Sequence, residues 1–212
     1  SVHWSLLYHT ISTANTIIDR LPVSEVSEEQ KTIAEAKARF FRGFAYRTLA
    51  YLYGGVPLLL TEVVEPKFDY VRASKEEVLK QALTDVEFAA VHLPSLSSVQ
   101  DGEVSNAAAY HLLSELYLAT AQYQKAVDAA TTVIDDPATG LMYTRFGSRA
   151  NEVPGDVYWD LFRKNNQNRG SGNTEGIWVI QIETDTPGGS GSLTAKDQTY
   201  TLERHHAPMV RD

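Results

Sequence analysis

Apolar residues recur at steps of three and four up to about residue 137, the spacing that predicts amphipathic helices. The first such stretch covers residues 3–21 and ends before Pro22. The second covers residues 27–53 and ends before two glycines, which favour a helix stop. Ser27 and Gln30 have the spacing of a capping box at its start. We therefore expect two long helices at the beginning of the chain.

The same spacing predicts three more helices before the pattern weakens. The third opens with a second capping box at Ser74 and runs to Leu93, which precedes a proline. A fourth helix is expected from about Ser105, and a fifth follows Ala121 and ends near Ile134. Residues 1–137 are thus predicted to be helical.

Residues 138–212 are predicted to be a loop-rich, ligand-binding and incomplete part of the same domain. A short helix is expected at 157–163, and "GIWVIQIE" (176–183) alternates in the way that is typical of a strand. Loops rich in glycine, serine and asparagine surround both elements.

An internal repeat indicates how the helices are arranged. Two of them share an aromatic residue, a leucine, a small residue and a second aromatic residue at steps of 0, 3, 4 and 7: Tyr46, Leu49, Ala50 and Tyr53, and Tyr110, Leu113, Ser114 and Tyr117. Small residues let paired helices approach while aromatic residues fill the flanking grooves, as in tetratricopeptide repeats. We expect a mainly α protein of tetratricopeptide-like helix pairs (an α-α superhelix), with a small irregular, β-containing C-terminal part.

Composition and charge exclude several functions. The net charge of −8 leaves no broad basic face for nucleic acid, so no nucleic-acid partner is predicted. The chain has no cysteine, which excludes disulfides, thiolate zinc sites and cysteine nucleophiles within it. Arg42, Arg47 and a Gly-Gly-Val-Pro break interrupt the aromatic stretch 40–60, so it is not predicted to span a membrane. Because the sequence starts inside a helix without a leader, we expect a fragment of a longer protein.

Catalytic and metal motifs do not point to an enzyme. The sequence contains no GxSxG, no HExxH and no phosphate-binding glycine loop followed by lysine. His205-His206 lacks a third ligand at a characteristic spacing, so no metal site, catalytic residue or cofactor is predicted.

The segment 158–183 has the residue types of a sugar-binding surface. Planar amides and guanidinium groups can bond neighbouring hydroxyls, while aromatic faces stack on pyranose rings. The candidate ligand-binding residues, chosen by chemistry and loop position, are Trp4, Trp159, Asn166, Arg169 and Tyr200. Two structural interpretations stand beside this one: a solvated loop anchored by Trp159, and packing of Trp4 within the first helix pair.

Four blocks of the sequence resemble the SusD/RagB family of outer-membrane nutrient-binding lipoproteins. They are "AEAKARFFRGFAYRTLAYLYGGVPLL", "RASKEEVLKQALTDVEFAAVHLP", "GEVSNAAAYHLLSELYLATAQYQKAVDAATTVID" and "GNTEGIWVIQIE". The resemblance covers about residues 1–185, and the region from Arg39 to Pro57 is its most specific mark.

The resemblance implies a lipid-anchored protein at the cell surface of the outer membrane, placed as a lid over a TonB-dependent transporter. Such proteins bind oligosaccharides or, in some branches, peptides, and pass them on without chemistry. The lipidated cysteine of the family is absent from this chain, and no shared ligand triad can be carried over. We therefore predict non-catalytic glycan capture, with a peptide-binding member or a tetratricopeptide-type interaction scaffold as the alternatives.

Overall fold

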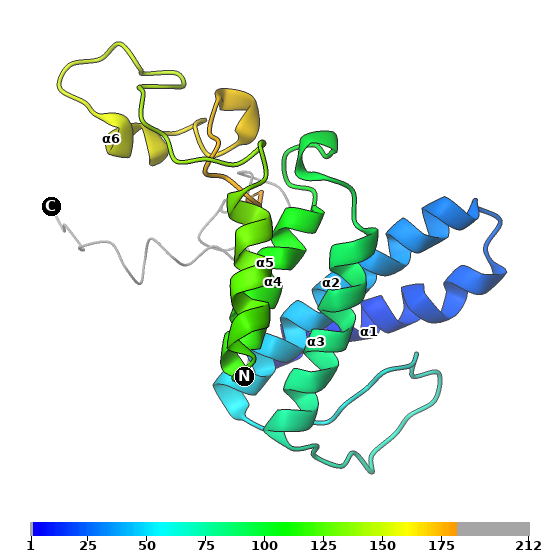
Figure 1. Ribbon diagram of the computed structural model, residues 1–212. Coiled ribbons are helices and arrows are strands. Elements are labelled where there is room, and N and C mark those ends of the chain that lie inside the picture. The colour runs from blue at the N-terminus through cyan, green and yellow to red at the C-terminus, as the bar shows by residue number, and fades with distance from the viewer. Residues whose placement is uncertain (1, 182–212) are drawn as a thin grey trace, which may run out of the picture. The chain divides into compact units, whose positions relative to one another are not determined.

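The computed structural model describes residues 2–181, with side chains from His3 onward. The residues Ser1–Trp178 form one compact unit, and only 179–181 of the second unit, Val179–Asp212, are described. Five long helices build the first unit: α1 (Val2–Arg20), α2 (Glu28–Tyr53), α3 (Lys75–His92), α4 (Asn106–Ala119) and α5 (Tyr123–Ile134). Each packs against the next along the chain (Figure 1), which confirms the predicted mainly α fold.

Two capping boxes explain where α2 and α3 begin. Ser27 Oγ accepts from the Gln30 backbone N–H at 3.2 Å, and Gln30 Oε1 accepts from the Ser27 N–H at 3.1 Å. Ser74 and Glu77 repeat the arrangement at 3.2 and 2.7 Å. Such caps satisfy backbone donors that a helix start leaves open, and each stabilises its helix by about 1 kcal/mol. Both predicted boxes are confirmed.

The centre of the core is α2, which packs against α1 and α3. Phe40, Tyr46 and Leu49 are all buried on it. Gly43 brings α3 close: a Cβ at this position would lie 2.5 Å from Val86 Cγ2 and 3.0 Å from the Ala82 carbonyl oxygen. The aromatic run of α2 is therefore largely explained by packing on several sides.

A buried polar network ties α1, α2 and α3 to the segment that follows α2. Arg42 donates to both carboxylate oxygens of Asp85 at 2.8 and 2.7 Å, and to Asn15 Oδ1 at 2.8 Å. Asn15 in turn donates to the Leu59 carbonyl at 2.8 Å, which also accepts from the Tyr46 hydroxyl at 2.8 Å. Because buried polar groups are costly without partners, this network fixes the path of the chain after α2.

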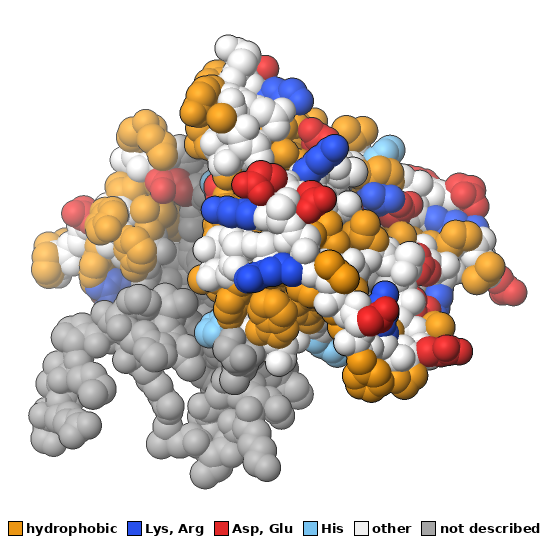
Figure 2. Space-filling model, turned by 90° about the horizontal axis from the view of Figure 1, so that it is seen from below, with side chains coloured by type: hydrophobic (Ala, Val, Ile, Leu, Met, Phe, Trp, Pro, Cys, Tyr) orange, Lys and Arg blue, Asp and Glu red, His pale blue; other side chains and the backbone are white. Residues whose placement is uncertain are grey.

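Acidic and basic side chains are interspersed on the surface of the described residues. In Figure 2, basic and acidic side chains stand next to one another and among apolar ones on the face seen from below. Lys37 and Glu103, for example, form an ion pair at 2.8 Å. No helix in the described part of the chain combines the length and apolar character that a bilayer crossing requires.

Residues 138–178 are mostly loop, so the predicted change from helices to loops after residue 137 falls inside the first unit. They contain the short helix α6 (Val157–Leu161), which confirms the short helix expected there, and a 3-10 turn at Arg169–Ser171. The predicted strand 176–183 is wrong over residues 176–181, where the structure has no strand pairing; 182 and 183 lie outside the described residues. The predicted β-containing part is accordingly not formed within the described chain.

Packing on the helices explains why the alternating pattern does not make a strand. The Trp178 ring lies 5.5 Å from the Phe40 ring and 6.0 Å from the Phe44 ring. Its indole N–H donates to the Gly102 carbonyl at 3.2 Å. Ile177 and Trp178 are thus partly buried against the helical core, without the neighbouring strand that a ladder needs.

Candidate ligand-binding site

Arg145 organises the loop that carries α6. Its Nε and Nη2 donate to the Asp160 carboxylate at 2.5 and 3.1 Å. Its remaining bonds go to the backbone carbonyls of Glu152, Gly155 and Arg149, at 3.1, 2.8 and 2.9 Å. All five N–H groups of the guanidinium therefore have acceptors, and one side chain fixes the course of residues 145–160.

Asp160 is the acid that pairs with Arg145, and its side chain is fully buried. The Phe146 backbone N–H donates a further bond to Asp160 Oδ2 at 3.2 Å. Hydrogen bonding from the Arg145 guanidinium holds the pKa of Asp160 below its ordinary value. The carboxylate is therefore a charged structural group, inaccessible to a ligand.

Asn166 supports the same loop from inside. Its amide donates to the carbonyls of Phe146 and Asp160 at 3.3 and 3.0 Å, and its Oδ1 accepts from the Ser148 N–H at 3.1 Å. Gly147 has a φ of +75°, and a Cβ there would lie 2.1 Å from Asn166 Oδ1. Because Asn166 is fully buried, this predicted ligand residue holds the loop backbone in place and is not exposed to a ligand.

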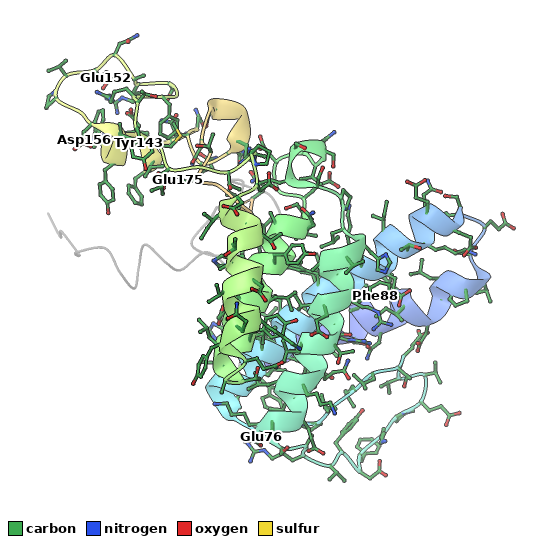
Figure 3. The ribbon with its side chains drawn as sticks, in the orientation of Figure 1. Glu76, Phe88, Tyr143, Glu152, Asp156 and Glu175 are labelled. Carbon is green, nitrogen blue, oxygen red and sulfur yellow. The ribbon has the colours of Figure 1, made fainter. Side chains whose placement is uncertain are left out.

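A hollow with a cavity volume of about 760 Å³ lies beside α6; we call it the α6 hollow. Its lining residues are Pro154, Gly155, Asp156, Tyr158, Trp159, Phe162 and Arg163. Figure 3 shows Asp156 at the start of α6 and Glu152 on the preceding loop. All of its lining comes from one short stretch of chain, which the Arg145 and Asn166 contacts hold in place.

Two exposed aromatic rings form the apolar part of the α6 hollow. Tyr158 and Phe162 are 71% and 73% exposed, and their ring centroids lie 5.0 Å apart. They are four residues apart, so a helical turn brings both to one face. The side chain of Asp156 accepts from the Trp159 N–H at 2.7 Å and caps this turn.

Trp159 lines the hollow but is covered by guanidinium groups. The Cζ atoms of Arg163, Arg149 and Arg145 lie 3.1, 5.3 and 5.7 Å from its ring centroid. These distances are those of cation–π contacts, so the protein's own arginines already occupy part of the Trp159 ring surface. Trp159 therefore anchors the loop as the solvated-loop interpretation expected, while it also forms part of the wall of the hollow.

The other predicted site residues lie elsewhere. Trp4 lies on α1 with its ring 4.9 Å from Tyr8 and 5.1 Å from Tyr53, within the first helix pair. Arg169 donates to the carbonyls of Ala138 and Gly176 and so connects loop segments. Tyr200 lies outside the described residues. Of the four candidates that the structure describes, only Trp159 lines the α6 hollow.

Sequence reasoning missed Tyr158, Phe162 and Arg145, and it counted Arg163 in the polar segment 158–183 without choosing it as a candidate. The first two carry a signal that could have been read, because the run "VYWDLF" puts aromatic residues four apart in a predicted helix. The role of Arg145 depends on contacts up to fifteen residues away in a loop, and loops have no periodicity that would reveal them.

A second groove of about 390 Å³ lies between α2, α4 and residues 175–178. Phe40, Phe44 and Trp178 line it, together with the ion pair in which Arg47 Nε donates to Glu115 Oε1 at 2.8 Å. Glu175 Oε1 accepts from the Met142 N–H at 2.8 Å. The first bond joins α2 to α4, and the second joins two segments of the loop region.

The chemistry that the α6 hollow offers is that of binding. Its aromatic faces can cover apolar surface, Asp156 can accept hydrogen bonds, and Arg163 can donate them. Nowhere in the described residues do three or more histidine, aspartate or glutamate side chains group as metal ligands.

Comparison with known proteins places this geometry in context. A SusD-like family profile, described as "Starch-binding associating with outer membrane", matches residues 1–118. SusD-like protein P25 of Formosa agariphila is 24% identical over 188 residues, which cover 87% of this chain and 32% of the relative. SusD-like protein P2 of the same organism is 29% identical over 140 residues, covering 65% and 28%.

Solved structures show the same fold. A SusD-like protein from Bacteroides fragilis NCTC 9343 superposes with a TM-score of 0.71 at 23% identity, covering 87% of this chain and 34% of the other. A laminarin-binding SusD-like protein gives 0.61 at 28% identity, covering 68% and 33%. A structure with xylogluco-oligosaccharide gives 0.68 at 24% identity, covering 89% and 36%. The chain thus spans about a third of the length of these relatives.

Proposed function

Because the chain belongs to the SusD-like family, we propose that it binds an oligosaccharide or polysaccharide at the α6 hollow without changing it chemically. The family is described as starch-binding and associated with the outer membrane. Laminarin and a xylogluco-oligosaccharide are named for two of the similar structures. These names support a glycan as the class of ligand for this chain as well.

The observation that carries the proposal is the exposed Tyr158–Phe162 pair. The two rings lie side by side at a hollow, with 71% and 73% of their surface exposed to water. Neighbouring exposed apolar side chains of this kind mark surfaces that a ligand or partner covers. The apolar face of a pyranose ring fits such a surface, and aromatic residues are well suited to contact because they lose little conformational freedom.

Polar groups at the edge of the hollow complete the proposed mechanism. Asp156 accepts from sugar hydroxyls and Arg163 donates to them, so that water bonded to the sugar is replaced by protein groups. Every hydroxyl must lose its water before it is bonded again, which keeps the affinity modest. Weak capture suits a protein that hands its ligand on.

We place the protein at the cell surface in its full-length, lipid-anchored form, where it delivers the glycan to a TonB-dependent transporter. Support comes from the family description, which associates these proteins with the outer membrane. The anchor and the transporter contact are proposals, since the chain covers about a third of its relatives.

Isothermal calorimetry tests the proposal directly. The purified protein is titrated with laminarin, xyloglucan and starch oligosaccharides, and the titrations are repeated with Tyr158→Ala and Phe162→Ala. We expect saturable binding to at least one glycan that each variant weakens by about tenfold, the effect of losing roughly 1.4 kcal/mol.

Tyr143→Ala is the matched control, because Tyr143 is 82% exposed in the same loop region and does not line the hollow. Binding that Tyr143→Ala weakens as much as Tyr158→Ala would contradict the assignment of the hollow. Silence across the panel would contradict glycan binding and favour the scaffold interpretation, and release of shortened sugars on long incubation would contradict a non-catalytic role.

A further inference from the structure

Arg163 differs from the other two arginines around Trp159. Arg145 has an acceptor for every N–H group and pairs with Asp160, and Arg149 pairs with Glu152 at 2.5 Å. Arg163 forms no ion pair with any described residue, and its Nε is shielded from solvent without a hydrogen-bond partner in that part of the chain. A shielded donor without a partner is uncommon in folded proteins and calls for an explanation.

Arg163 contacts the Trp159 ring and lines the α6 hollow. Its Cζ lies 3.1 Å from the Trp159 ring centroid. A guanidinium that stacks on an aromatic ring keeps its terminal N–H groups in its own plane, where they can bind an anion through two parallel bonds. The stacking also limits the motion of the side chain, so little freedom is lost on binding.

The acidic groups near the hollow are nearly all occupied. Asp160 is buried and accepts from Arg145 and the Phe146 N–H, while Glu152 is paired with Arg149. Asp156 remains on the lining, with one of its oxygens already accepting from the Trp159 N–H. The charged groups on the lining of the hollow are therefore the Arg163 guanidinium and the Asp156 carboxylate, which already accepts one hydrogen bond.

We propose that the α6 hollow selects an anionic sugar, one that carries a carboxylate or a sulfate ester, and holds the anionic group on Arg163. The apolar ring face of the same or the next sugar lies on Tyr158 and Phe162, and Asp156 accepts from hydroxyls away from the anion. This inference rests on the proposed glycan binding and names its ligand class.

Matched pairs of probes test the selection. The protein is titrated with an oligogalacturonide and its methyl ester, and with a sulfated galactan oligosaccharide and its desulfated form. We expect at least one anionic member to bind about tenfold or more tightly than its neutral partner, the effect of one charge-assisted contact. Whichever pair shows the difference identifies the anionic group, and the difference is expected to shrink at high salt.

Substitutions then assign the effect to a residue. Arg163→Gln should abolish the preference, so that the anionic and neutral members of a pair bind equally well, and it should also weaken the neutral sugar because a donor to its hydroxyls is lost. Arg163→Lys should restore only part of the preference because the two-pronged donor is lost. Lys164→Gln is the control, since it removes the same charge from an exposed neighbour that does not line the hollow. Thermal unfolding of each variant verifies that the helices remain folded.

The outcomes separate this inference from the proposed function. Neutral and anionic sugars that bind equally well, with both lost in Tyr158→Ala, would leave glycan binding standing and overturn the selection by Arg163. A preference that survives Arg163→Gln or disappears equally in Lys164→Gln would also overturn it. If neither member of either pair binds, and the neutral glycan panel is silent too, both proposals fall.

Discussion

Two arginine–aspartate pairs with fully buried carboxylates hold different parts of this molecule. In both, the guanidinium reaches both oxygens of the acid: Arg42 with Asp85 at 2.8 and 2.7 Å, and Arg145 with Asp160 at 2.5 and 3.1 Å. The first pair joins α2 to α3, inside a large apolar core. The second joins a loop to the short helix α6, and the three other bonds of the arginine all go to backbone carbonyls.

The surroundings explain what each pair does. Around Arg42, residues such as Phe40 and Val86 bury apolar surface, so the pair adds orientation to helices that already cohere. Between residues 138 and 178, the buried side chains are Phe146, Asp160, Asn166 and Asn173, of which three are polar. Hydrogen bonds therefore hold the loop region together, as apolar packing holds the helices together. We accordingly expect the Arg145–Asp160 pair to stabilise the loop alone, and the Arg42–Asp85 pair to stabilise the whole helical unit.

The largest effect is expected from breaking the helical pair. Asp85→Ala leaves the Arg42 charge buried without its partner, which should lower the free energy of unfolding by about 3–5 kcal/mol. The whole helical unit should lose stability together, as measured by urea denaturation followed by circular dichroism.

Glu103→Ala provides the matched control for this prediction. It breaks the ion pair with Lys37, in which both side chains are about two-fifths exposed, and should cost less than about 1 kcal/mol. A loss for Asp85→Ala as small as that for Glu103→Ala would show that the buried pair contributes little to the fold.

A smaller, local effect is expected from Gly147→Ala. The residue would have to keep a φ of +75° and place its Cβ 2.1 Å from Asn166 Oδ1, so the turn must open. Backbone strain of this kind costs about 1–3 kcal/mol. Hydrogen exchange should quicken in residues 145–166 and stay unchanged in α2 and α3. Faster exchange in the helices as well would contradict the independence of the two regions.

Acid should destabilise the loop region around α6 through protonation of Asp160. Since the Arg145 guanidinium lowers the pKa of folded Asp160, the pair stabilises the loop at neutral pH and down to the ordinary carboxyl range, near pH 4. That stabilisation is lost as the pH falls through the lowered pKa. We expect peptic cleavage beside Tyr158 and Phe162 to rise below about pH 4, relative to cleavage at the exposed Phe68.

In Asp160→Asn, the cleavage ratio should already be high at pH 4 and should change little as the pH falls further. A ratio that follows pH in the variant as it does in the original protein would assign the acid response to another group.

The two regions also differ in how far the sequence predicts them. The five long helices follow from capping boxes, prolines and glycines that act within a few residues, so Ser27, Ser74 and Pro22 could be interpreted one at a time. The expected strand was wrong because the alternation around Trp178 serves contact with α2, and periodicity cannot tell which neighbour will bury a residue.

In the loop region, residue type indicated polar recognition but not which groups face solvent. Asn166 and Arg169 have the chemistry of ligand contacts, yet they bond to the protein's own backbone. Tyr158 and Phe162, which do face the hollow, differ from buried aromatic residues only in what packs around them. Such contacts span many residues of irregular chain, and no local pattern encodes them.

The smallest effect on stability is expected from the rings of the hollow themselves. Because Tyr158 and Phe162 are largely exposed, replacing either with alanine removes little buried apolar area and should change the free energy of unfolding by less than about 0.5 kcal/mol. Asn166→Ala, in contrast, leaves the N–H of Ser148 and two carbonyls without partners and should loosen the loop. Hydrogen exchange and calorimetry on the three variants distinguish residues that stabilise the loop from residues that contact the ligand. If Tyr158→Ala loosens the loop as much as Asn166→Ala does, the ring is a structural member of the region, and its loss of ligand would no longer identify a binding surface.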